Sequence, residues 1–179
     1  MSRAFVDEDA SDSGQTAVPE LKIPIPPGSR NYLTPQGAQA LSAELHCLTA
    51  SDRPQLLSLL ASDAGSEEVT LARRRLEETD RRIAYLYTMS SLAEVQSPPP
   101  PEGRDRVKFG AAVRVIDEDG RERSYRIVGV DEADPDSGLI GWPSPVARAL
   151  MGKRVGEQAL VKLPSGQESL TILALDYPG

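Results

Sequence analysis

The chain has 179 residues, of which 39% are hydrophobic and only 4% aromatic, so it can build a small and mainly aliphatic core. Its formal net charge of −7 argues against general binding to a nucleic-acid backbone, which requires clustered Lys and Arg. The single cysteine, Cys47, excludes an internal disulfide and is compatible with a cytoplasmic protein. There is no run of about 18 apolar residues, and the amino terminus lacks the basic-then-apolar layout of a secretory signal. We therefore expect a cytoplasmic location and no membrane span.

Residues 1–30 are acidic at their start and rich in proline toward their end. Such a composition buries too little apolar surface to offset the entropy of ordering. We therefore expect a disordered tail, in which the apolar spots Phe5-Val6 and Leu21 to Ile25 leave room for docking.

Residues 31–96 show the pattern of two helices. Thr34 is suited to cap the first helix and Pro35 to occupy its first position. Pro54 should kink or restart this helix, and the polar stretch 62–68 should end it. The second helix, from Val69 to about Val95, has two apolar rows at heptad spacing: Val69, Leu76 and Ile83, and Ala72, Thr79 and Leu86. We expect Leu76 and Ile83 to be buried in the seam of an antiparallel coiled-coil hairpin.

Residues 97–105 contain four successive prolines and predict a stiff linker. Beyond it, residues 106–179 alternate short β-rich runs with turns, which predicts one α+β domain with an antiparallel sheet. The expected strands are Val107–Ile116, Glu122–Val130, Leu139–Gly141, Ala159–Leu163 and Leu170–Leu175. Asp119-Gly120 indicates a β-hairpin turn, while Ser144-Pro145 and Gly152 indicate the two ends of a short helix.

The sequence contains no pattern of a complete active site. His46 and Cys47 are neighbours on a helix, so their side chains point about 100° apart and do not converge as base and nucleophile. No phosphate-binding loop, paired-cysteine motif or His-Glu metal motif is present. We therefore expect no enzyme with an active site of its own.

Four separated blocks of the last domain carry a specific resemblance. They are Phe109-Gly110-Ala111, the run 125–129 (YRIVG), the run 131–134 (DEAD) and the run 144–153 (SPVARALMGK). In this order they resemble the carboxy-terminal domain of the Gre family (GreA and GreB) of bacterial transcription elongation and transcript cleavage factors. Residues 32–35 (YLTP), 53–54 (RP) and 75–82 (RLEETDRR) resemble the hairpin of that family.

The resemblance implies an FKBP-like fold for the last domain, which docks on RNA polymerase while the hairpin enters the secondary channel of that enzyme. The docking residues that it implies are Asp131, Glu132, Asp134, Ser144, Pro145, Ala147 and Arg148. The protein would then act as a monomer that contacts nascent RNA inside the complex, with no independent DNA binding.

The carboxylates Asp63, Glu67 and Glu68 lie at the predicted hairpin end. In Gre factors an acidic pair at this place helps to hold a Mg²⁺ ion that takes part in cleavage of backtracked RNA, and Mg²⁺ prefers such hard oxygen ligands. Here the spacing between acids is four or five residues instead of three, and the tip is shortened and divergent. The cluster Arg73, Arg74, Arg75, Arg81 and Arg82 follows, and could either guide the transcript or form a solvated helix face.

Alternatives to a cleavage stimulator remain open at this stage. A channel-occupying regulator without cleavage activity needs only the docking surface and the hairpin. A Rnk-type regulator of another enzyme shares the expected fold, although the hairpin here looks longer. A peptidyl-prolyl isomerase would need an aromatic pocket, and the few aromatic residues of this domain are spread along the sequence.

Overall fold

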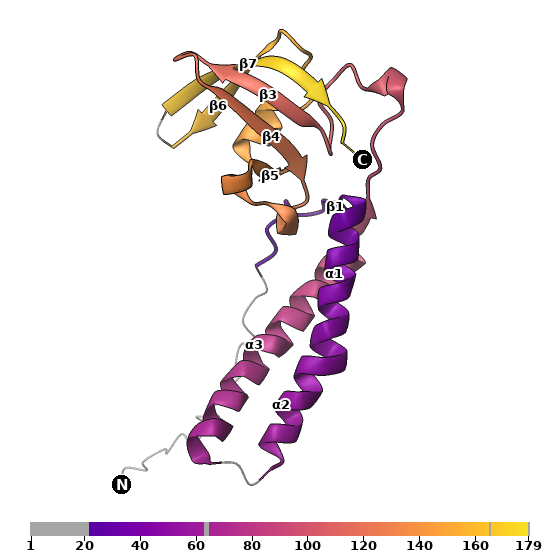
Figure 1. The fold of residues 1–179 in the computed structure, drawn as a ribbon, viewed down its shortest axis with the longest axis vertical. Helices are drawn as coiled ribbons and strands as arrows, with labels where there is room; N and C mark the ends of the chain where they lie inside the picture. Colours follow the sequence, from indigo (N-terminus) through magenta and orange to yellow (C-terminus); the bar gives the residue numbers. More distant parts are fainter. Residues whose placement is uncertain (1–21, 63–64, 165, 179) are drawn as a thin grey trace, which may run out of the picture.

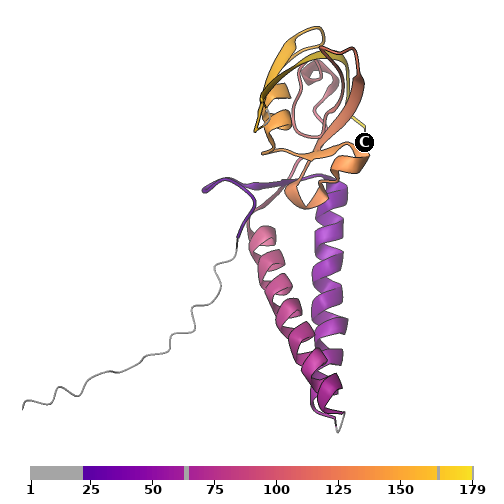
Figure 2. The same ribbon diagram turned by 90° about the vertical axis from the view of Figure 1, so that its left-hand side faces the viewer.

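A helical hairpin carries a small β-rich domain at one end, as both views of the computed structural model show (Figures 1 and 2). The structure describes residues 22–62, 65–164 and 166–178. Within this part of the chain, no helix is long and apolar enough to cross a membrane. The predicted α+β class, with a helical hairpin before it, is confirmed.

The first arm of the hairpin consists of α1 (Pro35–Cys47), a π-helical turn (Leu48–Asp52) and α2 (Arg53–Leu60). The Thr34 side chain caps α1 by accepting a hydrogen bond from the Gly37 backbone N–H at 3.0 Å, as the sequence predicts. Pro54 lies in the first turn of α2, directly after the π-helical turn. Because proline lacks an N–H, the ladder is interrupted there and the helix restarts.

The second arm, α3 (Ser66–Ser91), ends four residues earlier than predicted. The predicted last turn of this helix is instead the strand β2 (Ala93–Val95), which pairs in parallel with β1 (Asn31–Leu33). Asn31 donates from its backbone N–H to the Leu92 carbonyl at 2.8 Å, and its buried side chain donates to the Met89 carbonyl at 3.1 Å. These bonds join the two ends of the hairpin. Pairing between segments that lie about 60 residues apart in sequence therefore forms in place of the last helical turn.

The seam of the hairpin differs from the predicted one. Ala72 and Leu86 are buried, whereas Leu76 and Ile83 are only half-buried, so the prediction that Leu76 and Ile83 are buried is wrong. A pair of helices without a third layer shields one row of side chains well and leaves the neighbouring row beside solvent.

The last domain is built on a curled sheet (Figure 2). Its strand order is β5-β4-β3-β7-β6. Its elements are β3 (Ala112–Asp117), β4 (Glu122–Val128), β5 (Leu139–Gly141), α4 (Pro145–Leu150), β6 (Gln158–Leu163) and β7 (Gly166–Asp176). Strand β4 pairs with β5 in parallel, so the sheet is mixed and not antiparallel throughout. The first strand begins at Ala112 and not at Val107, because the chain turns at Gly110, whose φ of 83° favours glycine.

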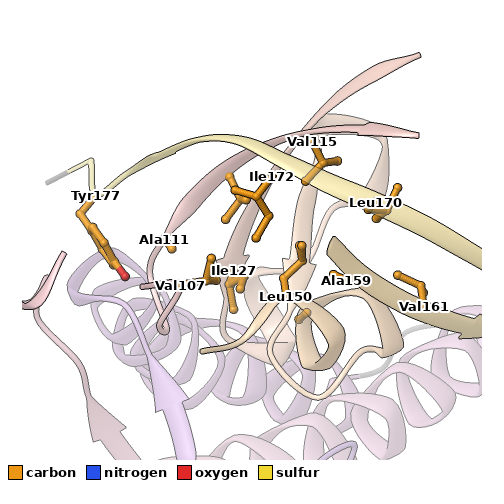
Figure 3. Packing of buried hydrophobic residues seen from close by; sticks show 12 residues of the cluster. Val107, Ala111, Val115, Ile127, Leu150, Ala159, Val161, Leu170, Ile172 and Tyr177 are labelled. Atoms are coloured by element: carbon orange, nitrogen blue, oxygen red, sulfur yellow. The ribbon is translucent and has the colours of Figure 1, made fainter. Parts of the chain in front are cut away.

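Alternate residues of the strands form the core of this domain, which we call the sheet core (Figure 3). Val113 and Val115, Ala159 and Val161, and Leu170 and Ile172 all point inward and are buried. Helix α4 covers the same interior with Ala147 and Leu150, which are also fully buried. Ser144 caps this helix by accepting from the Ala147 N–H, as predicted.

A second apolar cluster lies where the hairpin meets the sheet. This hairpin-base cluster consists of Ile25, Leu33, Leu41, Leu86 and Met89. Ile25 belongs to the predicted tail, yet it is buried here, so the ordered body extends at least that far toward the amino terminus. Trp142 packs against both apolar clusters and joins them.

Candidate functional site

The hairpin tip lies at the end of the molecule opposite the sheet (Figure 1). Glu67 and Glu68 are exposed in the first turn of α3, where the positive end of the helix dipole favours carboxylates. Asp63, the third predicted ligand, lies outside the described residues. Since neighbouring helical residues diverge by about 100°, Glu67 and Glu68 do not aim at one point as a chelating pair.

The described oxygen donors of this tip, Glu67 and Glu68, suit Mg²⁺ in kind. In the described ranges, no three His, Cys, Asp or Glu side chains lie together as a metal-binding group. Mg²⁺ requires near-octahedral oxygen coordination and is commonly held by one or two carboxylates with further ligands from elsewhere. Glu67 and Glu68 are carboxylates of the kind that could contribute to such an ion.

The structure divides the predicted arginine cluster. Arg73, Arg74, Arg75 and Arg81 are exposed on α3. Arg82 instead donates two hydrogen bonds to Glu44 of α1, at 2.7 and 2.8 Å.

The bond between Arg82 and Glu44 shifts the pKa of both side chains. Hydrogen bonding from Arg82 holds the pKa of Glu44 below its usual value, and the same bond raises the pKa of Arg82. The Arg82 guanidinium further lies over the Tyr85 ring, 5.1 Å from its centre. Arg82 therefore stabilises the hairpin, and the four remaining arginines are the available cations.

Two of the predicted docking residues make contacts inside the molecule. Glu132 accepts hydrogen bonds from the Thr34 N–H at 3.0 Å, from the Gly129 N–H at 3.1 Å and from the Thr34 hydroxyl. Asp131 accepts a hydrogen bond from the Tyr85 hydroxyl at 2.8 Å. Both carboxylates thus connect the sheet to the hairpin.

Of the other predicted docking residues, some are buried or bonded within the molecule and the rest are exposed. Ala147 is fully buried and cannot contact a partner, so its assignment to docking is wrong. Ser144 is occupied as the cap of α4. Asp134, Pro145 and Arg148 are exposed. The pKa of Asp134 is lowered, chiefly because the Ser137 hydroxyl donates to its carboxylate at 2.6 Å.

Arg148 belongs to a shallow hollow of about 380 Å³ that the sequence analysis missed. It is lined by Pro145, Arg148, Ala149, Leu160 and Lys162. Leu160 is 57% exposed and shares this hollow with two cations, Arg148 and Lys162, although the protein as a whole is acidic. The alternation along β6 could have revealed it, because burial of Ala159 and Val161 turns Leu160 to the opposite face.

Comparison with known proteins identifies the family. A family model described as "Transcription elongation factor, GreA/GreB, C-term" matches residues 101–177. Over 155 residues the chain is 37% identical to transcription elongation factor GreB of Neisseria meningitidis serogroup B, which covers 83% of this chain and 95% of that protein. The chain belongs to the GreA/GreB family.

A GreA relative is about as similar as the GreB relative. Transcription elongation factor GreA of Ruegeria pomeroyi is 38% identical over 152 residues, covering 81% of this chain and 96% of that protein. Among solved structures, GreA factor homolog 1 of Thermus thermophilus is 22% identical, with coverage of 82% of this chain and 99% of that chain and a TM-score of 0.38.

Membership in the GreA/GreB family makes this chain a transcription elongation factor and not an enzyme in its own right.

Proposed function

We propose that this GreA/GreB-family protein docks on bacterial RNA polymerase through its C-terminal domain and inserts its hairpin into the secondary channel. The observation that carries the proposal is the separation of two sets of exposed residues, those on α4 and β6 and the carboxylates at the start of α3. The sheet and this end of the hairpin lie at opposite ends of the molecule (Figure 1). Helix α3 has 26 residues, which corresponds to a reach of roughly 40 Å. Action on RNA polymerase would place the protein in the cytoplasm.

The exposed residues Asp134, Pro145 and Arg148 are the proposed contacts with polymerase. The hollow beside Arg148 extends this surface with Leu160 and Lys162. An apolar side chain in a hollow shared with two cations suits an acidic helical surface that presents one apolar residue. Asp131 and Glu132 are left out of this surface, because their carboxylates are bonded within the molecule.

At the tip, Glu67, Glu68 and Asp63 are proposed to supply ligands to a Mg²⁺ ion shared with polymerase. Such an ion, once bound, would supply Lewis-acid chemistry for cleavage of backtracked RNA. The chain itself brings exposed carboxylates to the channel, and Arg73, Arg74 and Arg75 are placed to attract the phosphates of the displaced transcript.

A second candidate is a regulator that occupies the channel without stimulating cleavage. The divergence of Glu67 and Glu68 around α3 favours it, since two acids that point apart are poor partners for one ion. Both candidates require the same docking surface and differ only in what the tip does.

Cleavage of RNA in backtracked elongation complexes distinguishes the two candidates. The variant Asp63→Ala/Glu67→Ala/Glu68→Ala should lose stimulation at matched occupancy while binding polymerase normally. Glu77→Ala/Glu78→Ala is the matched control, because it removes an adjacent exposed acidic pair from the middle of the same helix. If the wild-type protein binds but adds no cleavage, the channel-occupying regulator stands.

The docking surface has a separate test. Arg148→Glu should weaken binding to core polymerase, whereas Arg121→Glu, at an exposed arginine on the β3–β4 turn, should not. Equal affinity of both variants for polymerase would refute the proposed surface.

A further inference from the structure

A three-residue turn, Val130–Glu132, connects the sheet to both arms of the hairpin. It follows β4 after one residue, Gly129, and each of its residues contacts a different part of the hairpin base. Val130 packs against the hairpin-base cluster, Asp131 bonds to Tyr85 on α3, and Glu132 bonds to Thr34 at the start of α1. The turn therefore holds two helices at two separate points.

Both carboxylate oxygens of Glu132 accept hydrogen bonds at the start of α1. One carboxylate oxygen accepts from the Thr34 and Gly129 N–H groups, and the other accepts from the Thr34 hydroxyl. The Thr34 hydroxyl oxygen accepts in turn from the Gly37 N–H in the first turn of α1. A Cβ atom at Gly37 would overlap the Glu132 carboxylate, so the absence of a side chain at this position makes room for the contact.

The contact with α3 continues into the hairpin. Tyr85 donates to Asp131, its ring lies beneath the Arg82 guanidinium, and Arg82 pairs with Glu44 on α1. Burial raises the pKa of the Tyr85 hydroxyl, and the hydrogen bond to Asp131 raises it further. A tyrosine hydroxyl is protonated at neutral pH in any case, and the upward shift lets this one keep donating in alkaline solution.

The covalent path between hairpin and sheet is the proline-rich segment that follows β2. One flexible or semi-rigid connection leaves the angle between two bodies open, so non-covalent contacts must set it. A single contact point would still permit rotation about that point. Contacts to α1 and α3 at the same time remove this rotation.

We propose that Asp131 and Glu132 are positioning residues that fix the direction in which the hairpin projects from the C-terminal domain. Glu132 fixes α1 through Thr34, and Asp131 fixes α3 through Tyr85. The functional consequence rests on the proposed function above: loss of these contacts would misdirect the tip within the channel and leave the docking surface intact.

The proposal can be tested on the full chain without polymerase. One nitroxide label is attached at Cys47, the natural and exposed cysteine near the end of α1, and a second at Glu118→Cys on the exposed β3–β4 turn. Double electron–electron resonance then measures the distribution of distances between hairpin and sheet.

Glu132→Ala should broaden this distribution, and Glu132→Ala/Tyr85→Phe should broaden it further and shift its mean. Glu132→Gln keeps an acceptor oxygen and should restore part of the wild-type width. Asp134→Asn is the matched control, because the Asp134 side chain bonds only within its own turn, and it should leave the distribution unchanged. Tyr85→Phe alone removes one hydroxyl and keeps the ring, so it remains informative if the double variant does not fold.

An unchanged distribution in folded Glu132→Ala and Tyr85→Phe proteins would overturn the proposal. This outcome is distinguishable from failure of the proposed function. If the distances change as expected and the wild-type protein does not bind polymerase, the positioning role stands and the polymerase proposal fails.

Discussion

Gly37→Ala tests the contact between Glu132 and α1 through the sign of its effect on stability. Gly37 is the third residue of α1. At an ordinary helical position, Ala is favoured over Gly by about 1 kcal/mol, so helix propensity alone predicts a more stable protein. The structure predicts the opposite, because the new methyl group would occupy the space of the Glu132 carboxylate.

The magnitude follows from the bonds that Glu132 must give up. Its side chain is flexible and can swing away, but the Thr34 and Gly129 N–H groups then lose their acceptor. Hydrogen bonds to a charged group contribute about 1.5–3 kcal/mol, and partial exposure of Glu132 favours the lower end for the set. After the gain of about 1 kcal/mol in helix propensity is subtracted from the lower value of about 1.5 kcal/mol, Gly37→Ala should lower the free energy of unfolding by about 0.5 kcal/mol.

Urea unfolding followed by far-ultraviolet circular dichroism measures this free energy in a double-mutant cycle with Glu132→Ala. In the Glu132→Ala background no carboxylate remains to be displaced, so Gly37→Ala should become stabilising. Gly65→Ala, at the N-cap of α3, is the control for the cycle: a Cβ there meets no atom within 4 Å, so its effect should be the same with and without the Glu132 carboxylate. If Gly37→Ala stabilises the wild-type protein as much as the Glu132→Ala protein, the reasoning is refuted.

Three further predictions concern the hairpin. Leu86→Ala should lower the free energy of unfolding by about 2–5 kcal/mol, because Leu86 is fully buried. Leu76→Ala should lower it clearly less, because Leu76 is only half-buried. Equal losses, measured by urea unfolding, would contradict the described seam. Because the pKa of Glu44 is lowered by Arg82, their pair should stabilise the fold above the unfolded pKa of Glu44 and lose this effect as pH falls through its folded pKa. Arg82→Ala should therefore remove no more than about 1 kcal/mol at neutral pH and less in acid, since both side chains are over 40% exposed. Because the pKa of Tyr85 is raised, this group should contribute stability below the unfolded tyrosine pKa of about 10, and the contribution should be lost as pH rises toward the folded pKa. Tyrosinate absorbance of the wild-type and Tyr85→Phe proteins should show Tyr85 among the last of the five tyrosines to ionise.

Local signals in the sequence predict much of the fold. Thr34-Pro35 and Ser144-Pro145 mark helix starts because a cap bonds to an N–H only three residues away. Asp119-Gly120 marks a turn because Gly120 adopts a φ of 81° between two paired strands. In each case the chemistry lies within a few neighbouring residues, so the sequence contains it.

Features that depend on distant partners could not be predicted in this way. Strand β2 looks like the end of a helix until its pairing with β1 is known. Glu132 looks like an exposed acid, and its partner Thr34 lies 98 residues earlier in the chain. The family resemblance marked the run 131–134 as important but could not say whether its side chains face a partner or the hairpin.

The position of Trp142 gives the protein an internal optical probe. It is the only tryptophan of the chain, it packs against both apolar clusters, and its ring meets Tyr32 edge to face at 5.4 Å. The indole N–H is buried and lacks a hydrogen-bond partner among the described residues. Because indole emission shifts to longer wavelength as water gains access, the intrinsic fluorescence of the unlabelled chain reports on the joint between hairpin and sheet. Local melting at the distant tip should leave the emission spectrum unchanged, whereas opening of this joint should shift it to the red.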